Sequence, residues 1–260
     1  MKKYVFLGLG LFSSTFFSLP TIAAPYGFYV EAEGVEGQSL KDMLGTIAAR
    51  GQKPLSYSQV WQALKDTNED PNNSDNVILY YSGRSQAKSY TASGSNDQNA
   101  WNREHIWPKS FGFKRKNQWG YTDLHHLQPT DVKINAIRSN KDFDYGGSPI
   151  SKSPLNKTDW DSFEPRDEVK GDTARSIFYM AVRYDGNSGN MPDLYLVNDT
   201  SSSSGSYKMG KICTLLEWHN ADPVDNWERQ RHEKVVKWQG NRNPFIDNPK
   251  WVNDIYGDDC

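Results

Sequence analysis

The chain has 260 residues, a formal net charge of −2 and two cysteines, and 13% of its residues are aromatic. A chain of this length can bury a core of its own, and its aromatic side chains supply much of the buried area. Proteins that coat nucleic acid without selectivity are normally basic, so the net charge argues against that class. Any contact with nucleic acid would have to use a local basic patch.

The N-terminus has the pattern of a secretory signal peptide. Two lysines precede an apolar run over residues 4–12, and small residues lead to Ala23. The run is shorter than the roughly 20 residues of a membrane-spanning helix, so a membrane anchor is the weaker alternative. We therefore expect a signal peptide over residues 1–23 and a single exported domain over residues 24–260. Cleavage removes two lysines and no acid, which lowers the net charge to −4.

Both cysteines, Cys213 and Cys260, lie after the expected cleavage site. In an oxidising compartment they are expected to form one disulfide that holds the C-terminus. Two free thiols are the alternative, and the sequence alone leaves it open.

The first third of the chain is predicted to contain two helices and a buried strand. Apolar side chains recur every three or four residues over residues 39–50, which predicts a helix that stops at Gly51. A capping box over Ser56–Gln59 predicts the start of the second helix. Residues 67–76 are rich in Asp and Asn but lack the pattern of a calcium-binding loop, so a solvated loop is expected. Residues 77–81 are a buried-strand candidate.

The middle of the chain is predicted to fold as strand, loop, strand and helix. Strands are expected over residues 103–107 and 121–128, the second ending at Pro129. Thr130 is expected to cap a helix that runs to about Arg138. This order places Glu104 and His105 on the first strand and Asn135 on the helix.

The last part of the chain is predicted to be helical after an irregular stretch over residues 141–170. A serine-rich segment is expected to be flexible, and on the last helix Arg231 and the pair His232-Glu233 are expected to face solvent. No internal repeat or domain boundary is found. The predicted helices cover residues 172–184, 212–220 and 226–238.

Three residues in the middle segment have the chemistry to hydrolyse a phosphodiester. His105 is the candidate general base, because the unperturbed pKa of histidine lies close to neutral pH. Glu104 and Asn135 offer oxygen ligands, which together with waters suit Mg²⁺ or Mn²⁺ and not zinc. Neighbouring residues on a strand point to opposite sides, so Glu104 and His105 should have different partners. A base and one hard cation can together activate water and stabilise the departing oxygen.

A basic cluster and a histidine pair near these residues have two interpretations each. The cluster either follows a nucleic-acid backbone or is a solvated loop. His125 and His126 are expected to pack or to support the site, because alternation lets only one face it and no further ligand lies at zinc spacing. The basic cluster consists of Lys109, Lys114, Arg115 and Lys116.

Residues 103–108, 123–129 and 135–140 together resemble the bacterial endonuclease I family of secreted and periplasmic nucleases, and residues 239–245 are similar to its C-terminal segment. The resemblance extends from about Tyr80 to Asp247. It implies an α+β fold, a mostly helical single domain around a ββα-metal (His-Me finger) core with short antiparallel strands.

By position, the resemblance makes His105 the general base, and Glu104 and Asn135 the magnesium ligands. It implies an exported monomer, secreted or periplasmic, that does not associate stably with membranes. Its substrate would be DNA, with RNA also expected, cut with little sequence preference to leave 5′-phosphate ends. Arg115 and Arg138 are the candidates for the arginine that supports the phosphate.

Two alternatives remain at this stage. An exported, aromatic-rich binding module would carry Glu104 and His105 without catalysis. A related nuclease restricted to RNA would differ in contacts to the 2′-hydroxyl that the sequence does not reveal.

Overall fold

The computed structural model describes residues 24–94, 97–186 and 191–260, so the expected signal peptide lies outside the described residues. The longest helices are α4 and α6, with 14 residues each, and short 3₁₀ turns separate several elements. The helices are α1 Gly37–Ala49, α2 Gln59–Thr67, α3 Val132–Arg138, α4 Lys170–Arg183, α5 Ile212–Ala221, α6 Asn226–Gln239, α7 Pro244–Asp247 and α8 Trp251–Tyr256. The 3₁₀ turns are Val30–Ala32, Trp119–Thr122, Asp167–Val169 and Gly257–Asp259.

The strands of the described ranges form small separate sheets. One sheet has the order β1-β2-β3, one has the order β6-β9-β8-β7, and β4-β5 and β10-β11 are two-stranded. Most pairs are antiparallel, as expected, but β6 with β9 and β10 with β11 are parallel. The strands are β1 Glu69–Asp70, β2 Asn73–Ile78, β3 Ser85–Ala87, β4 Trp101–His105, β5 Leu127–Asp131, β6 Asp142–Phe143, β7 Ser148–Ile150, β8 Ser153–Thr158, β9 Ser162–Glu164, β10 Tyr195–Leu196 and β11 Lys208–Met209.

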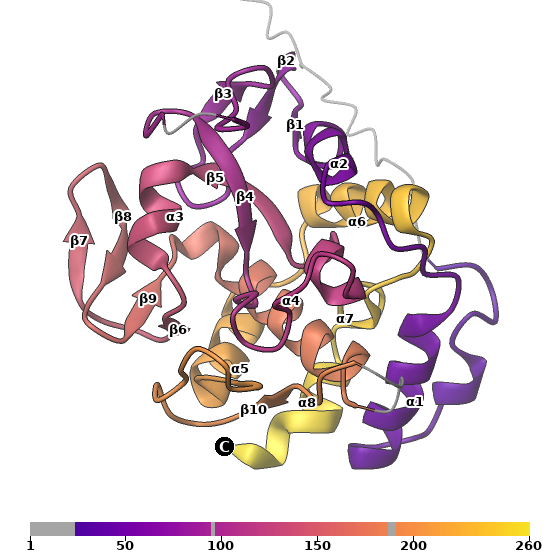
Figure 1. The fold of residues 1–260 in the computed structure, drawn as a ribbon. Coiled ribbons are helices and arrows are strands. Elements are labelled where there is room, and N and C mark those ends of the chain that lie inside the picture. The colour runs from indigo at the N-terminus through magenta and orange to yellow at the C-terminus, as the bar shows by residue number, and fades with distance from the viewer. Residues whose placement is uncertain (1–23, 95–96, 187–190) are drawn as a thin grey trace, which may run out of the picture.

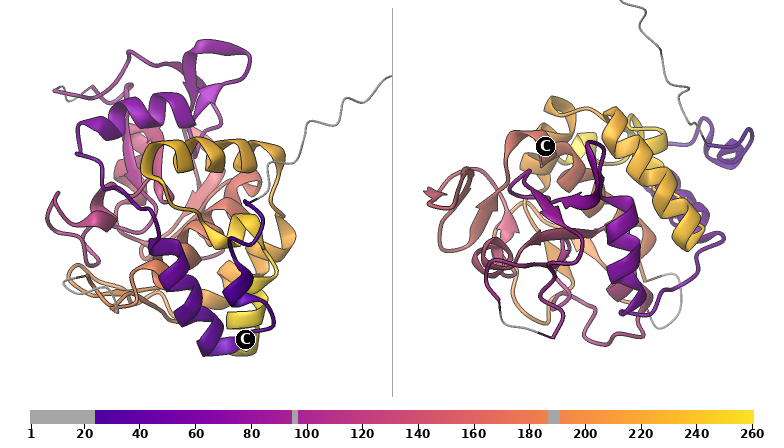
Figure 2. Two further views of the ribbon diagram at one scale, coloured as in Figure 1. Left: turned by 90° about the vertical axis from the view of Figure 1, so that its right-hand side faces the viewer. Right: turned by 90° about the horizontal axis from the view of Figure 1, so that it is seen from above.

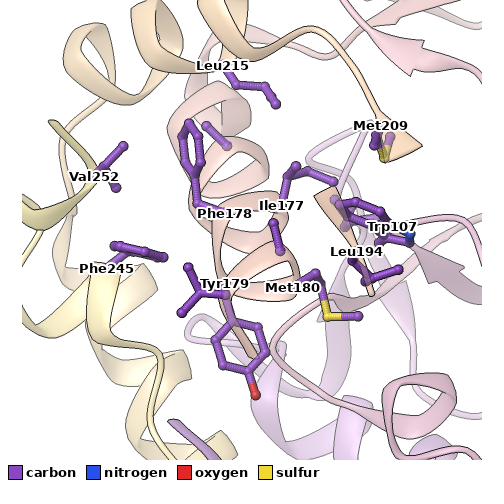
Figure 3. Close-up of a cluster of buried hydrophobic side chains, with 14 of the residues drawn as sticks. Trp107, Ile177, Phe178, Tyr179, Met180, Leu194, Met209, Leu215, Phe245 and Val252 are labelled. Atoms are coloured by element: carbon purple, nitrogen blue, oxygen red, sulfur yellow. The ribbon is translucent and has the colours of Figure 1, made fainter. Parts of the chain in front are cut away.

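Helix α4 lies inside the larger of two apolar clusters and is buried along nearly its whole length. Helices α1, α5 and α7 pack against it, as the arrangement in Figure 1 shows. In Figure 3, Ile177 and Met180 face Trp107 and Leu194, while Phe178 faces the C-terminal helices. A helix apolar on most sides is stable only when it is surrounded in this way.

The second apolar cluster lies between α2, α6 and strands β2, β4 and β5. Helices α2 and α6 lie side by side in Figure 2 and pack together. Trp101 at the start of β4 belongs to this cluster, whereas Ile106 and Trp107, just after β4, belong to the larger one. Strand β4 therefore runs from one apolar cluster to the other, and burial at both ends fixes the position of the residues between them.

A buried carboxylate, that of Asp123, joins distant parts of the chain. Its Oδ2 accepts hydrogen bonds from the hydroxyls of Tyr179 (2.7 Å) and Tyr184 (2.8 Å) and from the amide of Gln52 (2.9 Å). Its Oδ1 accepts from Gln239 (2.8 Å). A buried charge is tolerated when it is hydrogen-bonded this fully, and the bonds connect the segment before β5 to α4 and to the end of α6.

Two stretches predicted to lack structure contain strands. Residues 67–76 include β1 and the start of β2 rather than a solvated loop. Their acids and amides form the turns: the backbone N–H of Asn72 donates to Asp70 Oδ1 (2.8 Å), and that of Asp75 donates to Asn73 Oδ1 (3.1 Å). Residues 141–170 contain β6 to β9, which have two to six residues each, too few for a clear alternating pattern.

The second strand of the middle segment was predicted too early in the chain. Residues 119–122 form a 3₁₀ turn, and β5 continues through Pro129 to Asp131. Proline is tolerated because β5 is an edge strand of a two-stranded sheet. The residue that precedes α3 is therefore Asp131 and not Thr130.

The prediction for the surface of α6 was also wrong. Arg231 and His232 are buried. Arg231 Nη2 donates to the carbonyl oxygens of Leu124 (2.9 Å) and Leu127 (2.7 Å). The long arginine side chain follows the segment before β5, where backbone carbonyls need donors.

Candidate active site

Strands β4 and β5 and helix α3 follow one another in space in the order that the sequence predicted. The strands pair antiparallel, with Glu104 opposite Gln128 and His105 opposite Leu127. Helix α3 continues directly from β5 and packs against both strands (Figure 1).

The three predicted catalytic and metal-binding residues line one cleft of about 610 Å³. Glu104 and His105 come from the end of β4, and Asn135 comes from α3. The same cleft is lined by Arg103 and Lys109. Strand, strand and helix therefore bring a carboxylate, an imidazole and a carboxamide to one cavity that also carries positive charge.

Glu104 is buried and held at one oxygen. Its Oε1 accepts hydrogen bonds from the hydroxyl of Tyr81 (2.8 Å) and from Nη1 of Arg138 (3.1 Å). Burial raises the pKa of the Glu104 carboxyl, and Arg138 and the Tyr81 hydroxyl only partly offset this. Both of these side-chain bonds end on Oε1.

His105 contacts different partners from those of Glu104, as alternation on a strand predicts. Its Nε2 lies 3.0 Å from the carbonyl oxygen of Tyr121. A carbonyl oxygen only accepts, so Nε2 carries the proton and Nδ1 is the unprotonated nitrogen of the neutral ring. Burial, with His126 and the nearby cations, holds the pKa of His105 well below its usual value. The ring is therefore neutral at physiological pH.

Asn135 is oriented by a second amide. Its Nδ2 donates to Oδ1 of Asn102 at 2.8 Å, and a longer contact of 3.5 Å reaches the carbonyl oxygen of Arg103. Within the described ranges, Oδ1 of Asn135 accepts no hydrogen bond. Asn102 also lines the cleft. Its bond to Nδ2 of Asn135 fixes the orientation of the Asn135 amide, so that nitrogen and oxygen cannot exchange places.

Arg138 is not placed to support a substrate phosphate, which corrects one of the two predictions for that role. Its guanidinium is buried and donates to Glu104 Oε1 and to the carbonyl oxygens of His105 (2.9 Å) and Ile106 (2.7 Å). From the last turn of α3, this side chain reaches the end of β4, where backbone carbonyls need a hydrogen-bond donor. Arg138 thus positions the residues of β4 and does not line the cleft.

The predicted basic cluster is exposed at Lys114, Arg115 and Lys116. None of these three lines the cleft, but Lys116 lines a groove beside it, and Lys109 lines the cleft itself. One member of the cluster, Lys109, therefore lies in the site, and the other three lie outside the cleft.

Arg103 was not among the predicted site residues, although it directly precedes Glu104. Its guanidinium carbon lies 3.4 Å from the centroid of the Tyr57 ring and 4.2 Å from that of Trp61, and it lines both the cleft and the adjoining groove. No local sequence pattern indicates this contact, because the two rings come from a segment more than 40 residues earlier.

The paired histidines are buried and hydrogen-bonded to the backbone. Nε2 of His125 lies 3.1 Å from the carbonyl oxygen of Asn241, and Nε2 of His126 lies 2.7 Å from that of Gly120. Burial lowers the pKa of His125 to about 3 and that of His126 to about 4. Both carbonyl contacts fit a supporting role and leave neither ring in the cleft.

A group of metal-ligand type side chains occurs elsewhere in the described part of the chain, at His232, Glu233 and Asp247. Arg242 forms ion pairs with both acids. An internal cation therefore already pairs with both acids of this group.

Cys213 and Cys260 form a disulfide, so the two thiols are not free. No helix in the described ranges has both the length and the apolar character needed to cross a bilayer.

Comparison with known proteins shows that the chain is similar in sequence to nucleases. The model of the Endonuclease I family matches residues 36–250. An extracellular ribonuclease of Bacillus subtilis (strain 168) is 50% identical over 244 residues, which cover 92% of this chain and 83% of the relative. An extracellular ribonuclease of Bacillus amyloliquefaciens is 51% identical, over 88% of this chain and 78% of the relative. An extracellular deoxyribonuclease of Aeromonas hydrophila is 28% identical over 48% of this chain and 49% of its own.

Proposed function

The chain belongs to the endonuclease I family, and from this membership we propose that it is an exported, sequence-nonspecific endonuclease that hydrolyses the phosphodiester bonds of RNA and DNA. His105 is the general base, and one Mg²⁺, replaceable by Mn²⁺, is bound by Glu104 and Asn135. The observation that carries the proposal is the shared cleft of these three residues.

His105 activates the attacking water through Nδ1. The contact of Nε2 with the Tyr121 carbonyl fixes the ring and its tautomer. A base must be unprotonated to act, and burial keeps this ring neutral. Water attacks the phosphorus as its proton passes to His105, the bond between phosphorus and the 3′ oxygen breaks, and that oxygen takes up a proton from solvent to leave as a 3′-hydroxyl. The phosphate stays on the 5′ oxygen of the other fragment, which leaves 5′-phosphate ends.

The donor set suits a hard divalent cation. Glu104 contributes its second carboxylate oxygen and Asn135 its carbonyl oxygen, which is the pair of ligands expected for magnesium. When bound, such a cation would neutralise charge on the phosphate and stabilise the departing oxygen. The hydrogen bond from Arg138 positions the Glu104 carboxylate, and the bond to Asn102 orients the Asn135 amide. Strands β4 and β5 and helix α3 would then form a ββα-metal core.

The proposed substrate includes RNA and DNA. The relatives named ribonucleases cover most of this chain, and the relative named a deoxyribonuclease is more distant. Contacts to phosphate and sugar without contacts to base edges give little sequence preference. Because the ribonuclease names belong to the relatives with the higher identity, a nuclease restricted to RNA is the second candidate.

We also propose that residues 1–23 are a signal peptide, that residues 24–260 form a single nuclease domain, and that the mature protein is a monomer. The names of the relatives, which are extracellular enzymes, support export.

The test is digestion of supercoiled plasmid and of a structured RNA by the mature chain, with Mg²⁺ or with EDTA. We expect cleavage of both that stops with EDTA and in His105→Ala, while His105→Ala still binds nucleic acid. Cleavage of RNA alone would favour the second candidate. Binding without any cleavage by the wild type would favour a binding module.

A further inference from the structure

A groove of about 770 Å³ adjoins the catalytic cleft and shares a wall with it. The wall consists of Tyr57, Trp61 and Arg103, which line both cavities. Lys116 and Asn117 also line the groove. A chain bound in the cleft would therefore reach the groove within a short distance.

The shared wall is a stack of flat groups. The guanidinium of Arg103 lies over the rings of Tyr57 and Trp61, and its Nη1 donates to the carbonyl oxygen of Tyr57. Its Nε is buried and has no hydrogen-bond partner among the described residues. Bases of single-stranded nucleic acid stack on both aromatic rings and arginine planes.

Each ring of this wall packs against a buried aromatic side chain. Trp61 packs edge-on against the buried Trp101, with 5.1 Å between ring centroids. Tyr57 packs edge-on against Tyr121 at 4.8 Å. A rigid aromatic platform loses little conformational entropy when a ligand binds.

The charge of the groove contrasts with that of the whole protein. The mature chain is acidic overall, but the residues that line the groove include Arg103 and Lys116 and no Asp or Glu in the described ranges. Lys116 Nζ lies 5.6 Å from the Tyr57 ring centroid. Positive charge beside stacking surfaces is the combination used by proteins that bind single strands.

We propose that this groove binds an unpaired nucleotide next to the scissile phosphate, with its base on the stack of Arg103, Tyr57 and Trp61. The enzyme would therefore prefer single-stranded RNA or DNA to duplex, because paired bases are not free to stack. This inference rests on the proposed nuclease function and adds the class of substrate.

The first test uses the wild-type protein. We expect a single-stranded oligonucleotide to be cleaved faster than the same sequence in a duplex. We also expect a strand of the same length built from stable abasic nucleotides to be cleaved about 5- to 150-fold more slowly, the range that corresponds to one stacked base. Equal rates on the abasic and the normal strand would overturn the proposal.

The second test uses Trp61→Leu, which keeps apolar bulk against Trp101 and removes the ring. In this variant, the kcat/KM on the single strand should fall by about 5- to 150-fold. The fold-decrease on the single strand should be at least five times the fold-decrease on bis(p-nitrophenyl) phosphate, a substrate that has no base. Trp61→Phe should retain much of the single-strand activity. Equal losses on both substrates, or no loss, would contradict the proposal.

The control is Trp160→Leu, because Trp160 is 87% exposed and does not line either cavity. This variant should change neither the kcat/KM on the single strand nor that on bis(p-nitrophenyl) phosphate. Should the wild type hydrolyse none of these substrates, the proposed nuclease function itself fails. Should the wild type cleave all of them while abasic strands and Trp61→Leu show no selective loss, only the groove proposal fails.

Discussion

Nη1 of Arg138 lies 3.1 Å from Oε1 of Glu104, and the two side chains are only 1% and 2% exposed. The same guanidinium donates to the carbonyl oxygens of His105 and Ile106. One residue at the end of α3 therefore holds both the side chain of the proposed metal ligand and the backbone beside the proposed base.

Replacing Arg138 by methionine should destabilise the protein by about 3–5 kcal/mol, because the buried Glu104 carboxylate loses its cationic partner. Urea unfolding at pH 7 measures this loss. Lys133→Met, at an exposed position of the same helix, should change the free energy of unfolding by less than about 0.5 kcal/mol. If both variants were equally stable, the buried pair would have no positioning role.

Replacing Asn135 by alanine should raise the magnesium concentration that gives half-maximal cleavage by about tenfold or more, because loss of groups at a metal site typically costs this much affinity. Asn135→Asp keeps an oxygen ligand and should need less magnesium than Asn135→Ala. The measurement is the cleavage rate as a function of Mg²⁺, with circular dichroism to verify folding. Superimposable titrations of wild type and Asn135→Ala would exclude Asn135 as a ligand.

Removing the disulfide should lower stability and leave the site intact. Cys213 and Cys260 are 47 residues apart, and a loop of this size corresponds to at most about 4 kcal/mol of unfolded-state entropy. The Cys213→Ser/Cys260→Ser variant should unfold at lower urea and cleave at an unchanged rate at 25 °C. If the wild type and the double variant had the same urea midpoint of unfolding, with and without reductant, the disulfide would contribute nothing to stability.

Stability should fall on acidification, in part through His125. Burial lowers the folded pKa of His125 to about 3, while in the unfolded chain it is near 6.5. Between about pH 3 and pH 6.5, unfolding is therefore accompanied by the uptake of a proton at His125. The contribution of His125 to the stability of the folded protein is complete above about pH 6.5 and is lost progressively as the pH falls towards 3.

The corresponding slope is about 1.4 kcal/mol per pH unit for this one histidine. His125→Asn should reduce the dependence of unfolding free energy on pH by that amount between pH 6 and pH 4. Comparing the two slopes removes the contribution of other titrating groups. Identical slopes would show that His125 does not titrate on unfolding in this range.

The sequence predicted best where local physical rules are strong. The capping box at the start of α2 forms as expected: Gln59 N–H donates to Ser56 Oγ (3.2 Å), and Ser56 N–H donates to Gln59 Oε1 (2.8 Å). Helices α1, α4, α5 and α6 lie within a few residues of their predicted bounds, because their apolar spacing is regular. The strand–strand–helix order around Glu104, His105 and Asn135 was predicted as well.

The remaining features depend on contacts between distant segments. Arg138 was predicted as one of two candidates to support the substrate phosphate. Its burial follows from its bonds to the carbonyls of His105 and Ile106, which no local pattern reveals. Arg103 faces two distant rings, Trp61 on α2 and Tyr57 just before it. The sheet of β6 to β9 has strands too short to predict from alternation.

The most direct test of the account is chemical rescue of a variant that lacks the proposed base. With Mg²⁺ present, His105→Gly should cleave a single-stranded oligonucleotide about 10²- to 10⁴-fold more slowly than the wild type. Added imidazole should restore part of that rate in the variant and leave the wild type unaffected. A His105→Gly protein that cleaves at the wild-type rate without imidazole would contradict the assignment of His105 as the base.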